Sequence, residues 1–348
     1  DVRYLTRAGF EEIAILKGRQ PISEMVEDPE TPSELRASLE LVLQARDFAA
    51  SLGLDAKETY TTYSDVGRDT LLLVLSAAPR DCLCAYTWKY PIVGRIPYKG
   101  FFDPDMAQSE AEELAELGYD TYLRPSSAFS TLGWFNDPLL STAASRDSVE
   151  MVALVLHEIL HNTIYVKSAT PFNESFAQMV GYRGAEAFFR EHGDTVAAAR
   201  AAARWQDEIV LGEFYAALGA RLDSLYNSTE DSATIARGRE EIGRWARQEL
   251  QGPVAERLVT YNIGRLPERP INNARIIAAR IYRTRLPLIE KWYQANGADV
   301  RQSVAAVKEG LDGSDDVWGI LTSISAPPTG SPGAAPPPPR RTDRPDRE

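Results

Sequence analysis

The segment HEILHNTIYVKSATPFNES, residues 157–175, contains two of the three histidines in the chain. His157 and His161 are four residues apart, and Glu158 directly follows the first of them. On a helix, side chains with this spacing lie on one face with their Cβ atoms about 5–6 Å apart. Both imidazoles can then reach one tetrahedral Zn²⁺ ion, while Glu158 projects toward a metal-bound water. The motif therefore predicts a zinc site, provided that it is helical.

The residues around the motif favour a helix. Asp147 and Glu150 can form a capping pair, and no Gly or Pro occurs from there to Tyr165. The two histidines and the glutamate of the motif are the only ionisable groups between Met151 and Tyr165. Charged groups that are costly to bury on an apolar helix usually have a partner or a task. This context favours a metal site over a purely structural helix.

A catalytic zinc ion usually has three protein ligands and a water, so a third ligand is needed. After a short turn, Thr170 can cap a returning helix and Pro171 suits its first position, which places Glu174 in the first turn. Ala177 and Gly181 lie on the same face as Glu174, and their small side chains would let the two helices approach closely. We expect Glu174 to be the third ligand.

His192 is the competing third ligand. It follows the end of a predicted helix and precedes Gly193. A histidine at such a position commonly interacts with the last carbonyl groups and the helix dipole. We therefore expect His192 to be a cap or a surface residue.

Peptide hydrolysis at such a site requires two further roles. Glu158 would act as the general base, taking a proton from the attacking water and passing it to the leaving amine. A donor is also needed for the developing oxyanion. Tyr282 is the preferred candidate, with Arg275 and Tyr165 as alternatives, and each could instead be a packing or surface residue.

Two other segments have both a substrate-binding and a structural interpretation. SAFSTLGWF, residues 127–135, precedes the metal helix and could be a sheet edge to which a peptide adds as a strand, with Gly133 allowing close approach. Its aromatic residues could equally fill a core. Asn272 and Asn273 could grip a substrate or cap the helix that starts there, and capping is the commoner use of Asn.

Composition narrows the class of protein. The chain has 348 residues, 44% of them hydrophobic, and a formal net charge of −12, which argues against a nucleic-acid partner. Its longest apolar runs, at 71–78 and 151–156, are much shorter than the ~20 residues of a membrane-spanning helix, and no leader segment is visible. Cys82 and Cys84 are too close to form a disulfide framework, and we expect two small strand residues rather than a metal or redox site.

The pattern of elements predicts an α+β protein, with a small N-terminal α/β sheet region followed by a mostly α-helical half. The expected regions are 1–146, an α+β region with the substrate-edge strand, 147–325, a helical zinc-binding catalytic region, and 326–348, a disordered proline-rich tail. In the first region we expect a helix at 32–52, with a capping box that starts at Thr31 and Pro32 at the first helical position, and a second helix at 104–117. We expect strands at 69–76, 87–102 (two strands) and 119–123. In the second we expect helices at 147–166, 171–191, 194–226, 230–250 and 271–296, the last kinked at Pro287.

Four segments together resemble a bacterial family of predicted zinc aminopeptidases, the Aminopep family. They are YPIVGRIPYKGFF (90–102), AFSTLGWFNDPLLST (128–142), HEILHNTIYVKSATPFNESFAQMVG (157–181) and INNAR (271–275). The similarity extends from about residue 2 to about residue 308.

The segment NESFA (173–177) is also similar to the motif that carries the third zinc ligand in gluzincin peptidases such as thermolysin. The resemblance thus implies a zincin-like fold, with the metal helix at the junction of the two halves, and a ligand role for Glu174. Gln178 stands where thermolysin-type enzymes carry an Asp, so the partner of the zinc-binding histidines is unassigned.

The resemblance implies a peptide substrate and a bacterial envelope location, periplasmic or anchored by a lipid upstream of this segment. Two other functions fit the sequence. One is a zinc amidohydrolase acting on a non-protein or cell-wall peptide amide. The other is a noncatalytic envelope scaffold that uses the tail as a polyproline docking segment. Glu158 argues against the scaffold, because a scaffold has no need of a carboxylate that faces a metal-bound water.

Overall fold

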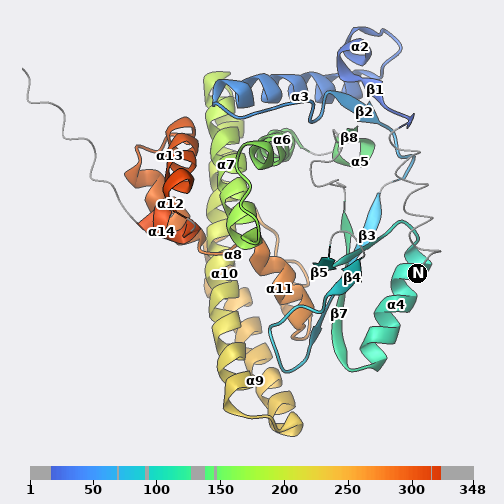
Figure 1. The fold of residues 1–348 in the computed structure, drawn as a ribbon, viewed down its shortest axis with the longest axis vertical. Helices are drawn as coiled ribbons and strands as arrows, with labels where there is room; N and C mark the ends of the chain where they lie inside the picture. The colour runs from blue at the N-terminus through green and yellow to red at the C-terminus, as the bar shows by residue number, and fades with distance from the viewer. Residues whose placement is uncertain are drawn as a thin grey trace, which may run out of the picture.

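The structure is a computed structural model, and it describes residues 17–68, 70–90, 94–126, 138–144, 147–314 and 316–322. The predicted α+β class is confirmed, because short strands and helices mix up to residue 144 and only helices follow in the described part (Figure 1). The strands are β1 (Gln20–Pro21), β2 (Thr62–Ser64), β3 (Leu72–Pro79), β4 (Trp88–Tyr90), β5 (Gly94–Ile96), β6 (Lys99–Phe101), β7 (Tyr119–Ser126) and β8 (Leu139–Leu140).

Helices make up the rest of the regular structure. In the first part of the chain they are α2 (Ile22–Glu27), α3 (Ser33–Ser51), α4 (Pro104–Glu116) and α5 (Ser141–Ala144). The second part contains α6 (Ser148–Thr163), α7 (Thr170–Glu191), α8 (Thr195–Ser228), α9 (Ser232–Gln251), α10 (Pro253–Arg257), the 3₁₀ turn η1 (Leu266–Glu268), α11 (Asn273–Ile281), α12 (Leu286–Ala295), α13 (Val300–Gly313) and α14 (Val317–Thr322).

The main sheet is antiparallel, with the strand order β6-β3-β7. Helix α4 packs on one face of β3 and β7, and α11 packs on the other, so α11 lies between the sheet and α8 (Figure 1). The face toward α4 is apolar, with Leu75, Phe101 and Ala111 in one buried cluster. This arrangement places the α11 side of the sheet beside the helical half of the molecule.

The helical half is organised around α8, which has 34 residues and is therefore about 50 Å long. Its first part shares the largest apolar core with α3, α6, α7 and α12 to α14. Its second part forms another core with α9, α10 and α11. Since α3 and α6 contribute to the same core, that core includes residues on both sides of the expected division at residue 146. The division into regions stays a prediction.

Several local predictions are wrong. Helix α3 begins after Pro32 without a side-chain cap, so the expected capping box at Thr31 does not form. The segment 87–102 contributes three short strands, β4 to β6, rather than two. The helix expected at 271–296 is divided into α11, which ends at Ile281, and α12, which follows Arg285, a residue in a left-handed conformation with φ 54°. A residue in that conformation ends the helical hydrogen-bonding pattern.

Cys82 and Cys84 form a disulfide in the loop after β3, so the expectation of two strand residues is also wrong. The predicted edge strand at 127–135 and the tail at 326–348 lie outside the described residues. Among the helices that the structure describes, none is long and apolar enough to cross a bilayer.

Candidate metal centre

Helix α6 carries His157, Glu158 and His161, as predicted. Its N-terminus is capped by Asp147, whose carboxylate accepts hydrogen bonds from the backbone N–H groups of Val149, at 2.9 Å, and Glu150, at 3.2 Å. The cap satisfies two of the N–H groups that a helix start leaves without partners. The helix then runs unbroken through the motif, and its apolar side chains are buried against α3 and α7.

Helix α7 brings Glu174 back to α6. Ala169 precedes its first turn, and no side chain caps it, so Thr170 is already helical and Glu174 falls in the second turn rather than the first. The tight connection is closed by Asn173, whose side-chain amide accepts from the N–H of Val166 at 3.0 Å and donates to its C=O at 2.8 Å. The sequence reading missed this role of Asn173.

The two helices pack closely beside the metal motif. A Cβ atom added to Gly181 would lie 2.7 Å from the carbonyl oxygen of Ala153 and 3.5 Å from the Cβ atom of His157. Ala177, on the same face, is fully buried. The predicted close approach at Ala177 and Gly181 is therefore present, and it is what brings the Glu174 carboxylate within reach of both histidines.

The donor atoms of His157, His161 and Glu174 all lie within 4.8 Å of one another. His157 Nε2 is 3.3 Å from Glu174 Oε2, and His161 Nε2 is 3.7 Å from Glu174 Oε1. Tetrahedral ligands about 2.0–2.1 Å from zinc would be about 3.4 Å apart, whereas good N–H···O hydrogen bonds have lengths of about 2.7–3.2 Å. The spacing therefore fits a tetrahedral ion better than it fits direct hydrogen bonds.

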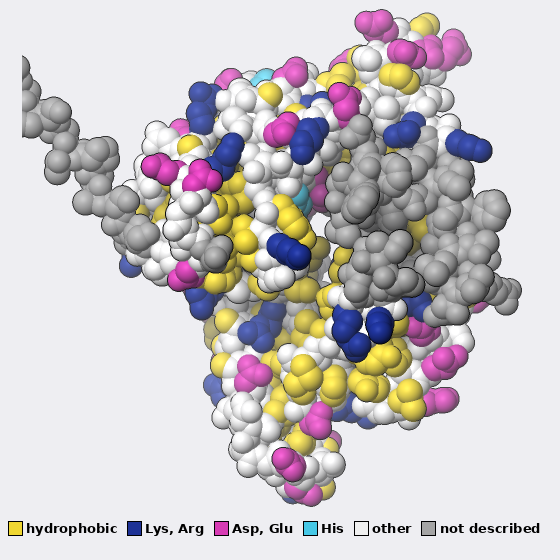
Figure 2. Space-filling view, in the orientation of Figure 1, with side chains coloured by type: hydrophobic (Ala, Val, Ile, Leu, Met, Phe, Trp, Pro, Cys, Tyr) yellow, Lys and Arg dark blue, Asp and Glu magenta, His cyan; other side chains and the backbone are white. Residues whose placement is uncertain are grey.

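The surroundings keep Glu174 negatively charged. Burial opposes its ionisation, but the polar contacts with His157 and His161 outweigh burial and lower the pKa of Glu174 to about 2. Burial also opposes the charged form of His161, yet the nearby carboxylates of Glu174 and Glu158 raise its pKa. On the face drawn in Figure 2, histidine and acidic side chains lie side by side near the centre.

One nitrogen of the site lacks a partner. His161 Nδ1 is buried and has no hydrogen-bond partner in the part of the chain that the structure describes. A histidine ligand usually donates this second N–H to a carboxylate or carbonyl group. Gln178, which replaces the acidic residue expected in thermolysin-type enzymes, does not supply that partner.

Comparison with known proteins gives the family. A family model described as "Putative aminopeptidase" matches residues 3–316. The chain belongs to the Aminopep family. Neither a curated protein nor a solved structure shows significant similarity to it. The resemblance found in the four sequence segments is thereby confirmed, whereas the likeness to gluzincins stays a prediction.

In this member of the Aminopep family, Tyr282 lies beside the three candidate ligands. It directly follows α11, and its ring centroid is 6.3 Å from that of His157. Ser175, the neighbour of Glu174, holds the segment around Tyr282 in place. Its hydroxyl accepts a hydrogen bond from Thr284 N at 2.9 Å and donates one to Ile281 O at 3.3 Å. Burial, followed by the charge of Glu174, raises the pKa of Tyr282 to about 12. Its hydroxyl is therefore protonated at neutral pH.

Two further residues near the centre were missed from the sequence. Tyr98 lies between β5 and β6, and burial and the charge of Glu174 raise its pKa. Arg124 is on β7, and its positive charge acts to lower the pKa of both Tyr98 and Tyr282. Tyr98 lies in the family-like segment 90–102, but no pattern of residue spacing links Tyr98 or Arg124 to the metal motif. Strand pairing and helix packing bring them to the site from segments far apart in the chain.

Other sequence candidates are placed elsewhere or have structural roles. Tyr165 directly follows the C-cap of α6 and is 63% exposed, although it is near enough to Tyr98 to contribute to the rise in the pKa of Tyr98. His192 ends α7 with Nδ1 2.8 Å from the carbonyl oxygen of Phe188, so it is a cap, as expected. Asn272 caps α11 through Arg275 N. Asn273 is fully buried, and its side chain donates to the backbone carbonyls of Pro79, at the end of β3, and Cys82, in the loop that follows. The structural interpretation therefore fits both asparagines.

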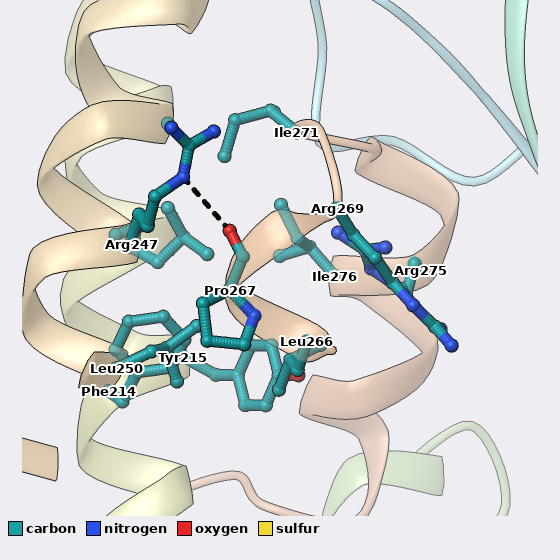
Figure 3. A pocket seen from close by; sticks show the side chains of 13 residues that line it. Phe214, Tyr215, Arg247, Leu250, Leu266, Pro267, Arg269, Ile271, Arg275 and Ile276 are labelled. Carbon is teal, nitrogen blue, oxygen red and sulfur yellow. Dashed lines mark hydrogen bonds between the residues drawn. The ribbon is translucent and has the colours of Figure 1, made fainter. Parts of the chain in front are cut away.

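Arg275 lines a pocket that lies at the start of α11, at the opposite end from Tyr282 (Figure 3). The floor is apolar and includes Phe214 and Tyr215. The Arg275 side chain donates to the carbonyl of Pro270 at 2.7 Å. Because about two turns of α11, roughly 10 Å, separate Arg275 from Tyr282, the pocket is not part of the metal centre, and Arg275 is not placed to stabilise an oxyanion there.

Proposed function

We propose that the protein is a zinc-dependent metallopeptidase in which His157, His161 and Glu174 hold Zn²⁺. The distances from the Glu174 carboxylate to the two imidazoles, 3.3 and 3.7 Å, carry this proposal because they are close to the separation of tetrahedral zinc ligands. Two imidazole nitrogens and one carboxylate are a common ligand set of catalytic zinc in peptidases. Membership of a family described as aminopeptidases supports peptide hydrolysis as the reaction. The envelope location stays a prediction from the resemblance.

A zinc ion held there would polarise the scissile carbonyl and make a water more acidic. Glu158 then acts as the general base: it accepts a proton from the attacking water and delivers it to the nitrogen of the leaving amine. Its carboxylate is close enough to raise the pKa values of both His161 and Tyr282. It is adjacent in sequence to a candidate ligand and projects from the same helix.

Tyr282 is assigned to the developing oxyanion. Its pKa of about 12 keeps the hydroxyl protonated at neutral pH, so it can donate a hydrogen bond when negative charge appears on the carbonyl oxygen. Ser175 holds the start of the α11–α12 connection and thereby fixes the position of Tyr282. Loss of one such donor costs about 100- to 1,000-fold in kcat in well-studied hydrolases.

The test is hydrolysis of short unblocked peptides by the zinc-loaded protein, compared with Glu158→Gln. We expect Glu158→Gln to retain zinc and its melting temperature but to lose at least about 100-fold in kcat, because the general base is gone. His192→Gln is the matched control, since it removes a histidine that caps a helix, and we expect wild-type activity. Equal activity of Glu158→Gln and the wild type would contradict the proposed function.

A further inference from the structure

Arg124 and Tyr282 reach the metal centre from two elements that pack side by side. Along β7, Tyr119 and Leu123 pack with the α4 side of the sheet, so residues 120, 122 and 124 point to the α11 side. Asp120 confirms this orientation, because its carboxylate accepts from the N–H of Asn273 at 2.7 Å, at the start of α11. Arg124 is therefore on the sheet face that α11 covers.

Arg124 on β7 and Tyr282 at the end of α11 lie at similar distances from the contact between Asp120 and Asn273. From Asp120 to Arg124 is four residues of strand, about 13 Å. From Asn273 to Tyr282 is nine residues of helix, also about 13 Å. Consistent with this position, the charge of Arg124 acts to lower the pKa of Tyr98 and Tyr282, and the charge of Glu174 acts to raise the pKa of both. The guanidinium thus lies at the border of the metal centre.

Arg124 differs from Arg239 and Arg283 because no carboxylate pairs with it among the described residues. Arg239, packed against the same sheet, binds Asp120 at 2.6 Å, and Arg283 binds Glu208 at 2.7 Å. Arg124 is only half-buried, and its side chain has neither an ion pair nor a hydrogen bond to the rest of the described chain. In a protein with a net charge of −12, an arginine that pairs with no described residue beside the proposed hydrolytic site can bind an anion.

We propose that Arg124 binds a carboxylate of the substrate close to the scissile bond, an inference that rests on the proposed peptidase function. The carboxylate belongs either to the peptide C-terminus or to an acidic side chain. Tyr282 already supplies an oxyanion donor, which leaves Arg124 for recognition. The carboxylates assigned at the described centre, Glu158 and Glu174, serve as base and ligand. Arg124 therefore recognises a negative charge on the substrate, and it determines specificity rather than activating water.

Four peptides separate the two sources of the carboxylate. Ala-Ala against Ala-Ala-amide tests the C-terminus, and Glu-Ala-amide against Gln-Ala-amide tests an acidic side chain. We expect the zinc-loaded wild type to prefer the charged member of one pair by about 10- to 100-fold in kcat/KM, as an arginine–carboxylate pair should provide. Arg124→Gln should remove that preference while hydrolysis of the neutral member is retained. Arg124→Lys should restore part of the preference.

Two controls make the result decisive. Arg301→Gln removes an equal charge from an exposed position on α13 and should leave the ratio unchanged. Binding of the same peptides to Glu158→Gln, measured by calorimetry, provides a readout that does not need turnover. A binding preference without hydrolysis by the wild type would overturn the proposed function but keep the role of Arg124. The role of Arg124 would be overturned if the wild type hydrolysed the charged and neutral members of both pairs with kcat/KM values within about twofold of each other. It would also be overturned if Arg124→Gln kept the wild-type preference, or if binding showed no preference.

Discussion

The two ends of α7 carry charged clusters that differ in how their carboxylates are paired. Near the start, Glu174 faces His157 and His161. Farther along, Arg183 binds Glu186 at 2.7 Å and also pairs with Glu290. Glu290 in addition accepts a hydrogen bond of 2.6 Å from the indole N–H of Trp205. In the second cluster each carboxylate has a permanent cation, and the atoms meet at hydrogen-bond distance.

The metal centre has no such permanent cation. Among the described residues, neither Glu158 nor Glu174 forms an ion pair with a Lys or an Arg, and the only cationic partners of Glu174 are histidines, which are charged only when protonated. A partly buried carboxylate is costly unless it is paired. The Arg183 cluster is complete within the protein and holds helices together, whereas a bound cation would complete the proposed centre at Glu174. The difference separates a structural ion pair from a candidate binding site on the same helix.

The largest change in stability is expected from Glu290→Ala. Removing this carboxylate leaves Arg183 without one of its two partners and Trp205 without its acceptor, which should lower the free energy of unfolding by about 3–5 kcal/mol. Chemical denaturation measures the change. Bound zinc per folded chain should be unaffected, and loss of zinc from the folded variant would show that the two clusters are not independent.

The pH dependence of the metal-free protein should follow the Glu174 cluster. Because the pKa of Glu174 is lowered to about 2, its contribution is present above its ordinary pKa and is lost as the pH falls from about 4.5 toward 2, at most about 3 kcal/mol. The pKa of His161 is raised, so its contribution is present below about 6.5 and is lost as the pH rises through the higher value of the folded state. The denaturation midpoint, measured against pH in the presence of a chelator, should fall on both the acidic and the basic side. In Glu174→Gln the midpoint should depend less on pH on both sides. Parallel curves for the two proteins would contradict this account.

A smaller effect is expected from Gly181→Ala. The added methyl group would meet the Ala153 carbonyl oxygen at 2.7 Å, so α6 and α7 must move apart, at a cost of about 1–3 kcal/mol, and zinc affinity should fall as Glu174 retreats. Gly243→Ala is the matched control. Its nearest neighbour, Ile271, would be 3.5 Å away, and the change should stabilise α9 by about 0.4–1 kcal/mol. Wild-type zinc affinity in Gly181→Ala would show that close packing does not position Glu174.

The sequence predicts the parts of the site that depend on local signals. The metal helix follows from the Asp147 cap and an uninterrupted apolar pattern, and the approach of Glu174 follows from the small residues of α7. Helix α4, with Asp103 as its cap, follows in the same way. Each of these signals lies within a few residues of the feature that it specifies, which is why a single sequence is sufficient to find them.

The features that sequence reasoning missed depend on long-range packing. Arg124 reaches the centre only because β7 pairs with β3 and α11 covers that sheet face. The break between α11 and α12 was predicted as a kink at Pro287, but its geometry depends on a hydroxyl of α7, that of Ser175. The closing of the turn by Asn173 was missed as well, because an amide that binds a backbone seven residues earlier leaves no recognisable pattern.

The central claim is tested most directly by the zinc content of the purified protein, measured by elemental analysis on the wild type, His161→Ala and Glu174→Ala, with His192→Ala as the control. We predict about one zinc ion per chain in the wild type and the control, and loss of zinc from both ligand variants while they stay folded. A folded wild type that takes up no zinc when the metal is supplied, or ligand variants that bind as much zinc as the wild type, would contradict the assignment of His157, His161 and Glu174 as a metal centre.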